Sequence, residues 1–160
     1  MSIDDAFGYW LAGFVDGEGC FVIKREPGGG RYACNFKLAL RLDDASIIRD
    51  IYQRTGIGQI YLGKPRGNTQ ASIRWMVTNK HDCLRLIGLL QRFPLRSKKQ
   101  RDFQLWVRAV TEWVGHKHGE SWTVMAWLHD RLQAIRAFES TGEIPAEAEG
   151  VLQLGLGVAL

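Results

Sequence analysis

The segment YACNFKLALRL, residues 32–42, alternates between apolar and polar side chains with a period of two. Its apolar positions are Cys34, Phe36, Leu38, Leu40 and Leu42. The positions between them hold Ala33, Asn35, Lys37, Ala39 and Arg41. Because successive side chains of a strand point to opposite faces, the segment predicts a strand with one face on a core and one polar, basic face.

The segments around this strand predict two β-hairpins. Residues 20–26 have strand-like composition, and the Pro-Gly-Gly-Gly run at 27–30 supplies a turn between them and residues 32–42. Residues 59–64 and 71–78 predict a second hairpin, joined through Pro-Arg-Gly-Asn at 65–68. In its second strand Ile73, Trp75 and Val77 alternate with Ser72, Arg74 and Met76.

Helical spacing and capping residues predict one helix before each hairpin. The first covers residues 6–15, is capped by Asp4 or Asp5, and ends in the turn Gly17-Glu18-Gly19. The second follows Asp43 or Asp44 as its cap and closes at Gly56.

Three further helices follow the second hairpin. Asn79 caps a helix over residues 80–91, Ser97 and Gln100 form a capping box for a long fourth helix, and the last spans 122–138. The order predicts an α+β fold, in which the two hairpins form one four-stranded antiparallel sheet with helices on its apolar face. We expect residues 1–140 to form a single domain and residues 141–160, which lack a clear pattern, to form a C-terminal tail.

Composition excludes several classes of protein. The chain has 160 residues, 46% of them hydrophobic and 24% charged, which is ordinary globular usage and excludes disorder of the whole chain. No apolar run is long enough to span a membrane, and the acidic start MSIDDAFGYW is unlike a secretory signal. The three separated cysteines Cys20, Cys34 and Cys83 predict buried thiols in a reducing compartment. We therefore expect an intracellular protein, in a bacterial cytoplasm or an organelle, that is neither secreted nor membrane-bound.

Charge is unevenly distributed along the chain. Residues 20–101 hold 17 Lys and Arg against 5 Asp and Glu, a net +12, while residues 1–19 and 102–160 each carry a net −4. The segregation favours a polyanionic partner over a surface that is basic by chance. A concave basic sheet fits a DNA major groove. The residues predicted to bind DNA are Lys24, Asn35, Lys37, Arg41, Tyr61, Lys64, Arg66, Ser72 and Arg74.

The end of the first helix carries the main candidate for chemistry. Glu18 lies between Gly17 and Gly19, where a carboxylate and backbone carbonyls together offer the hard oxygen ligands that Mg²⁺ prefers. The bare Gly-Glu-Gly pattern is more often a surface turn. Gly13 and Gly17 are four residues apart, however, so one helical face has no side chains and another backbone can approach it closely.

The nine residues 11–19, LAGFVDGEG, resemble the signature of the LAGLIDADG homing endonucleases, with seven positions identical or conservative. The departures are Gly17 for alanine and Glu18 for the second aspartate. The order of elements over residues 5–105 and the segment Gly56-Ile57-Gly58 also match the family pattern. One copy of the signature is present, so the resemblance implies a homodimer, whose interface would include Trp10, Gly13 and Gly17.

The resemblance also implies a catalytic site. It assigns Glu18 and the carbonyl of Gly17 to a Mg²⁺ ion, for which Mn²⁺ can substitute, and it implies no small-molecule cofactor. It assigns Lys98 to the scissile phosphate, with Lys99 and Arg101 competing for that role. Asp16 would shape the helix junction. Asp44 falls near a water-ordering position but is also explained as a cap, and Ile48 replaces the family arginine one turn later.

The function implied is sequence-specific cleavage of both strands of DNA at a long, roughly palindromic site, by Mg²⁺-dependent hydrolysis. Two alternatives of the same fold remain open. An RNA maturase would bind structured RNA, and a non-catalytic regulator would use the basic sheet alone to bind DNA. Retention of the acid at Glu18 and of a lysine at Lys98 favours the nuclease over both.

Overall fold

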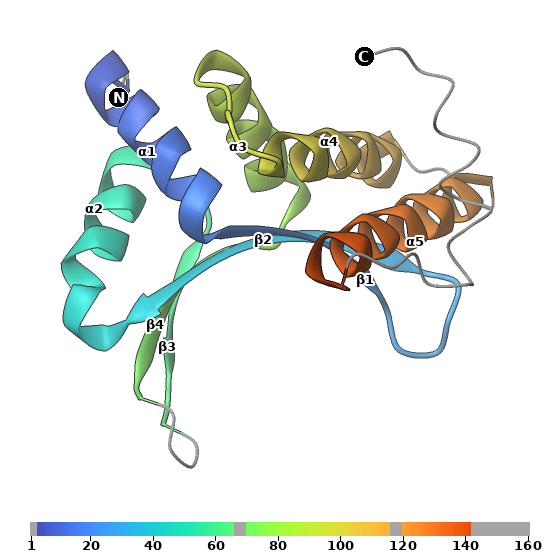
Figure 1. The fold of residues 1–160 in the computed structure, drawn as a ribbon, viewed down its shortest axis with the longest axis horizontal. Coiled ribbons are helices and arrows are strands. Elements are labelled where there is room, and N and C mark those ends of the chain that lie inside the picture. Colours follow the sequence, from blue (N-terminus) through green and yellow to red (C-terminus); the bar gives the residue numbers. More distant parts are fainter. Residues whose placement is uncertain (1–2, 66–69, 116–119, 142–160) are drawn as a thin grey trace.

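The computed structural model describes residues 3–65, 70–115 and 120–141. Within them the predicted order of elements is confirmed, and the chain is an α+β fold (Figure 1). In chain order the elements are α1 (Asp5–Glu18), β1 (Gly19–Arg25), β2 (Tyr32–Arg41), η1 (Leu42–Asp44), α2 (Ala45–Thr55), β3 (Gln59–Gly63), β4 (Ser72–Val77), α3 (Lys80–Arg92), α4 (Lys99–Gly115) and α5 (Glu120–Thr141).

The two hairpins form one antiparallel sheet with the strand order β1-β2-β4-β3. The two central strands therefore come from different hairpins, and their inward side chains lie opposite one another. Phe36 is paired with Val77 and Leu38 with Trp75, and all four side chains are fully buried. The period-two pattern of residues 32–42 predicted this face correctly.

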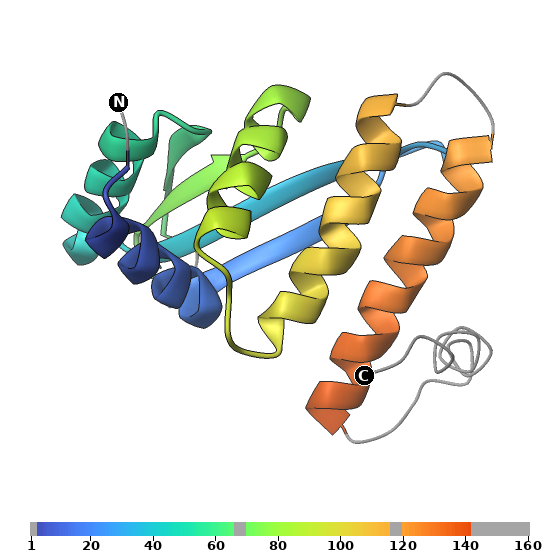
Figure 2. The same ribbon diagram turned by 90° about the horizontal axis from the view of Figure 1, so that it is seen from above.

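Helices α1 to α4 cover this apolar face, and the sheet arches away from them at both hairpins (Figure 1). Helix α5 lies beside α4 and packs against β1 (Figure 2). An ion pair fixes this packing: Arg136 Nη2 lies 2.6 Å from Asp102 Oδ2 and also donates to the carbonyl of Phe21 at 2.7 Å. The opposite face of the sheet is left uncovered by these helices.

Two helix starts confirm the sequence prediction. Asp4 Oδ1 accepts a hydrogen bond from Phe7 N at 2.9 Å at the start of α1, and Asn79 Oδ1 accepts one from Asp82 N at 2.8 Å at the start of α3. Both are side-chain caps that satisfy backbone N–H groups without an intrahelical partner.

The start of α2 differs from the prediction. The backbone leaves the sheet at Leu42, which begins the short 3₁₀ turn η1 and is 41% exposed, although the alternation placed it on the core face. Asp44 precedes α2 without making a side-chain cap, and Asp43 instead pairs with Arg41 at 2.8 Å. The 3₁₀ turn changes the direction of the chain. The alternation of the strand therefore ends at Leu42, and the predicted side-chain cap at Asp43 or Asp44 does not form.

The prediction of a turn at Gly17-Glu18-Gly19 is wrong. Helix α1 continues through Gly17 to Glu18, because glycine in a helix costs only about 1 kcal/mol and does not forbid it. Gly19 has φ −71° and ψ 149°, so it is extended and begins β1 directly. No loop separates the helix from the strand.

The predicted capping box of α4 forms only in part. Ser97 Oγ accepts from Lys99 N at 3.1 Å, as an N-terminal cap should. Gln100 Oε1, however, is buried and has no hydrogen-bond partner among the described residues. The N–H of Ser97 donates to Asp16 instead.

Two thiols are buried as predicted, and burial raises the pKa of both Cys34 and Cys83, the latter to about 12. Cys20 is only half-buried, because it lies on the uncovered face of β1. Across the described ranges, none of the helices has the length and apolar character needed to cross a membrane. The predicted tail, residues 141–160, lies almost entirely outside the described residues, and the single domain over 1–140 remains a prediction.

Candidate nucleic-acid interface and acid site

The pairing register places the predicted DNA-binding residues of the strands on one face. Lys37 lies opposite Met76, Ala39 opposite Arg74, and Arg41 opposite Ser72. Because paired residues of a sheet point to the same side, the whole set shares the face that the helices leave uncovered. The strand residues of this basic face are Lys24, Asn35, Lys37, Arg41, Tyr61, Ser72 and Arg74. Lys64 follows β3 directly, whereas Arg66 lies outside the described residues.

Two cations of the basic face have an acid beside them. Arg41 Nη2 lies 2.8 Å from Asp43 Oδ2, and Lys24 Nζ lies 3.6 Å from Glu26 Oε1. All four side chains are well exposed, so these pairs contribute little to stability. They do reduce the positive charge that Arg41 and Lys24 present to a partner.

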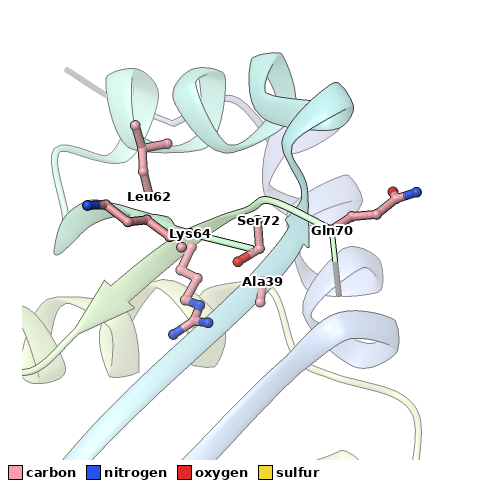
Figure 3. Close-up of a pocket in the computed structure, with 7 residues that line it drawn as sticks. Ala39, Leu62, Lys64, Gln70 and Ser72 are labelled. Carbon is pink, nitrogen blue, oxygen red and sulfur yellow. The ribbon is translucent and has the colours of Figure 1, made fainter. Parts of the chain in front are cut away.

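The basic face is hollowed beside Ala39, whose short side chain leaves room between longer neighbours. One hollow contains Ala39 and Ser72 at its centre, with Lys64 and Gln70 on opposite sides (Figure 3). A second, of about 730 Å³, shares Ala39, Gln70 and Ser72 with the first. Its remaining lining residues are Glu18, Leu40, Arg41, Asp44 and Ala71. Glu18 therefore opens into a hollow that is continuous with the basic face, and Asp44 lines that same hollow.

A lysine lies against the helix end that carries Glu18. Lys99 Nζ donates to the carbonyl of Gly19 at 2.6 Å and to that of Gly17 at 3.3 Å. The last turn of α1 contains no basic residue, so this ammonium supplies the positive charge that a helix C-terminus favours. The sequence favoured Lys98 for the role beside the acid; the structure brings Lys99 to the Gly17 carbonyl, and the role of Lys98 stays a prediction.

The position of Lys99 explains its reach. It is the first residue of α4, and side chains on a helix lean toward the helix N-terminus, here toward the end of α1. Lys98 is exposed and lies just before the helix begins. Ser97 Oγ accepts from Lys99 N, which fixes Lys99 at the start of the helix.

Asp16 joins the end of α1 to the segment before α4. Its Oδ2 accepts from Arg96 N at 2.7 Å and from Ser97 N at 3.3 Å, and its Oδ1 accepts from Ser97 Oγ at 2.7 Å. Each of these bonds joins residues at least 80 positions apart in sequence. The predicted role of Asp16 in shaping the helix junction agrees with this geometry.

The oxygen atoms at the end of α1 fit a hard divalent cation. Glu18 is exposed, and it offers a carboxylate next to the Gly17 carbonyl, whose oxygen accepts from Lys99 at 3.3 Å through one of its two lone pairs. In the part of the chain that the structure describes, no cluster of three or more His, Cys, Asp or Glu residues could hold a metal. Mg²⁺ keeps several waters and shares phosphate oxygens, so a carboxylate and a backbone carbonyl are donors of the kind that it uses.

The outer face of α1 is open where the sequence predicted a dimer contact. A Cβ atom added at Gly13 or Gly17 would meet nothing within 4 Å. Trp10 is 44% exposed and stacks on Phe14, with ring centroids 5.3 Å apart. Gly8, on the inner side of the same helix, is packed against the ring of Phe93. The face of Trp10, Gly13 and Gly17 therefore has room for another molecule.

The sequence matches the family model described as LAGLIDADG endonuclease over residues 11–110. It is 29% identical over 107 residues to the probable intron-encoded endonuclease Cox1-I1b of Schizosaccharomyces pombe, covering 65% of this chain and 27% of that protein. It is 32% identical over 108 residues to the probable intron-encoded endonuclease 3 of Neurospora crassa, covering 63% and 20%. The chain thus spans between a fifth and about a quarter of these relatives.

Solved structures share the fold. The LAGLIDADG meganuclease I-AabMI bound to uncleaved DNA matches with a TM-score of 0.69 and 25% identity, over 83% of this chain and 49% of that one. The homing endonuclease I-TnaI matches with a TM-score of 0.65 over 88% of this chain and 99% of that one, and at 21% identity it supports the fold alone. The signature at residues 11–19, the fold and the family model agree: the chain belongs to the LAGLIDADG endonuclease family.

Proposed function

We propose that this chain is a sequence-specific endonuclease that cleaves double-stranded DNA by Mg²⁺-dependent hydrolysis. The observation that carries the proposal is the hollow that joins Glu18 to the basic face. An acid placed beside bound phosphates is what metal-assisted phosphodiester hydrolysis requires, and a basic, arched sheet is what a major groove accepts. Such an enzyme acts inside the cell, where its DNA lies.

The proposed active form is a symmetric dimer. The open face of α1, with Trp10, Gly13 and Gly17, permits close approach of the same helix from a second copy. Since Glu18 ends that helix, pairing of the helices would bring two acids together, one for each DNA strand. Two-fold symmetry of the protein then implies a roughly palindromic target.

The residues at and beside the end of α1 would have two roles, metal binding and stabilisation of charge on the phosphate. Glu18 and the carbonyl of Gly17 would hold Mg²⁺, or Mn²⁺ in its place. Such an ion, when bound, polarises a phosphate and lowers the pKa of an attacking water. The ammonium of Lys99 lies beside the same carbonyl, where it can stabilise negative charge on the phosphate. Lys98 remains the alternative for that role.

The principal test replaces Glu18 by glutamine. Duplexes that the wild-type protein binds are first selected from a library and sequenced after incubation with Mg²⁺. Glu18→Gln keeps the size of the side chain and removes its charge, so it should abolish cleavage and leave DNA affinity equal or higher. Glu112→Gln, the same change on α4, is the matched control and should cut normally.

The outcome separates the three candidate functions. A wild-type protein that binds a preferred duplex but never cuts it in Mg²⁺ or Mn²⁺ would refute the nuclease and leave the DNA-binding regulator. Preferential binding of a structured RNA, with no DNA cleavage to lose in Glu18→Gln, would instead favour the maturase.

The lysines are compared in the same assay. Lys99→Ala should slow cleavage by about 10²–10³-fold, the usual effect of losing one group that stabilises transition-state charge. Lys98→Ala should have the smaller effect. If Lys98→Ala slows cleavage more than Lys99→Ala, the role of stabilising charge on the phosphate belongs to Lys98.

The dimer is tested at Gly13. Because a Cβ atom there has open space, Gly13→Leu should fold, with a circular dichroism spectrum like that of the wild type, and still fail to pair, since leucine holds two helices apart. Sedimentation should give about twice 18.1 kDa for the wild type and the monomer mass for the variant. A wild-type monomer that stays monomeric on DNA would refute the dimer.

A further inference from the structure

A closed ring of hydrogen bonds surrounds the end of α1. Asp16 Oδ1 accepts the hydroxyl hydrogen of Ser97 at 2.7 Å, and Ser97 Oγ in turn accepts from Lys99 N at 3.1 Å. The side chain of Lys99 then returns to α1, where Nζ donates to the carbonyls of Gly17 and Gly19 at 3.3 and 2.6 Å. The ring thus starts at Asp16, two residues before Glu18, and ends at Gly17 and Gly19, on either side of Glu18.

Two further bonds fix the orientation of Asp16 within this ring. Its Oδ2 accepts the N–H groups of Arg96 and Ser97, at 2.7 and 3.3 Å. One carboxylate therefore holds the backbone of the segment that leads into α4 and the hydroxyl that caps the helix. Hydrogen bonds donated to a charged acceptor are about twice as strong as neutral ones, so this is a firm attachment for an exposed segment.

The ring matters because lysine is a flexible side chain. An ammonium on four methylenes loses up to about 2 kcal/mol of rotamer entropy when it is held in one place. Its first helical position in α4 gives Lys99 the right direction only if the start of α4 is fixed relative to α1. Asp16 makes this connection, through the side chain of Ser97 and the backbone N–H groups of Arg96 and Ser97.

We infer that Asp16 is a positioning residue, which holds the Lys99 ammonium beside the Gly17 carbonyl by fixing the start of α4. Asp16 does not act on the phosphate itself. Its effect on cleavage rests on the proposed function, whereas its effect on the position of Lys99 holds in the free protein. The two parts therefore have separate tests.

The first test measures the accessibility of Lys99 without DNA or metal. The protein is treated with a limiting amount of an N-hydroxysuccinimide ester, and acylation is quantified at each lysine by mass spectrometry. Lys99 should react more slowly than the exposed Lys64, because its ammonium is held by two carbonyls. Asp16→Ala should raise the Lys99 rate toward that of Lys64, and Ser97→Ala should raise it part of the way.

Asp82→Ala is the matched control for general loss of stability. Asp82, at the start of α3, also accepts three hydrogen bonds, from Gly58 N, Asn79 Nδ2 and Arg85 Nη1. None of these partners belongs to the ring, so the variant should leave Lys99 acylation unchanged. If Asp16→Ala does not fold, Asp16→Asn, which keeps the shape and loses the charge, takes its place beside Ser97→Ala.

The second test is a double-mutant cycle on cleavage of the selected duplex at saturating protein. Asp16→Ala should lower the single-turnover rate by about 10- to 100-fold, the scale expected for misplacing a reacting group by about 1 Å. In the Lys99→Ala background the same change should have almost no effect, because the group that it positions is gone. DNA affinity in Ca²⁺ should be unaltered.

Two results would overturn the inference. One is a Lys99 acylation rate that Asp16→Ala and Ser97→Ala leave unchanged. The other is an equal fall of the cleavage rate in both backgrounds, which would assign Asp16 a structural role unconnected with Lys99. Absence of any cleavage by the wild type would refute the proposed function, and the acylation result would still decide whether Asp16 positions Lys99.

Discussion

The two faces of β4 differ completely, although their residues alternate along one chain. Ile73, Trp75 and Val77 are fully buried beneath the helices, while Ser72 and Arg74 remain accessible on the basic face. Residues 74 and 75 are covalent neighbours, yet one carries a charge in water and the other lies in the core. Along β4, residues that stabilise the fold thus alternate with residues proposed to contact DNA. Substitutions on the buried face should change stability, and substitutions on the basic face should change DNA binding.

The largest effect is expected on the buried face, at Trp75. Its ring packs edge-on against Phe36 with centroids 5.3 Å apart, and its Nε1 donates to the carbonyl of Ile57 at 2.6 Å. Trp75→Ala should lower the free energy of unfolding by about 3–5 kcal/mol, measured by urea denaturation. The neighbouring Arg74→Ala should change it by less than about 0.5 kcal/mol. Similar losses of unfolding free energy in Trp75→Ala and Arg74→Ala would contradict the assignment of the two residues to opposite faces.

The next effect is expected on the basic face, at Arg74. A guanidinium that contacts guanine in the groove is worth about 1–3 kcal/mol of discrimination against the wrong base. Arg74→Ala should therefore relax the sequence preference at particular base pairs, measured by binding to a library of single-substituted sites. Arg41→Ala should show a weaker loss, because Asp43 already pairs with Arg41. A uniform loss of affinity over all sites would show that these side chains contact phosphates only.

A smaller and different effect is expected at Lys64, beyond the end of β3. A lysine that neutralises one phosphate contributes about 0.9 to the slope of log K against log salt. In the proposed dimer Lys64→Ala removes one such lysine from each subunit, so it should reduce the slope by about 1.8 and weaken all duplexes alike, as measured by binding titrations at several salt concentrations. A change in sequence preference would instead place Lys64 among the residues that contact bases.

The smallest effect is expected on the helix side, at Asp82. Burial by itself raises the pKa of this carboxyl, but hydrogen bonds from Asn79, Gly58 and Arg85 together hold the pKa below its usual value. A lowered pKa in the folded state stabilises the protein above the ordinary carboxyl pKa of about 3.9, and this contribution is lost as pH falls through the lowered value. The stability difference between wild type and Asp82→Asn should therefore shrink in acid, as thermal unfolding at pH 7 and pH 3 can measure. A stability difference that is the same at pH 7 and at pH 3 would contradict this prediction.

The strands were predictable because their signal is local. The alternation in residues 32–41 requires no knowledge of the rest of the chain, and the buried side chains of β2 follow it until the 3₁₀ turn at Leu42. The same holds for caps such as Asn79, whose partner Asp82 is three residues away. Predictions from local patterns failed where a residue distant in sequence makes the hydrogen bond instead. Gln100 does not complete the predicted capping box, because Asp16 already accepts the N–H of Ser97.

The candidate site was predictable only in outline. Glu18 and Gly17 are marked by the signature of residues 11–19, and the basic face by charge and parity. The choice between Lys98 and Lys99 depends on how α4 meets α1, a contact between segments some 80 residues apart that no pattern in either segment encodes. The hollow that joins Glu18 to Ser72 is likewise a product of tertiary packing.

The direct passage from α1 into β1 determines where the chain tolerates insertions and deletions. One residue added between Glu18 and Gly19 would shift β1 by one position against β2, and every side chain of β1 would exchange faces. Phe21 and Ile23 would then leave the core. The hairpin loop after β1, where Gly28, Gly29 and Gly30 all have positive φ, is exposed and free of such coupling. Length variation among functional variants of this chain should therefore occur at that loop and be absent from the junction.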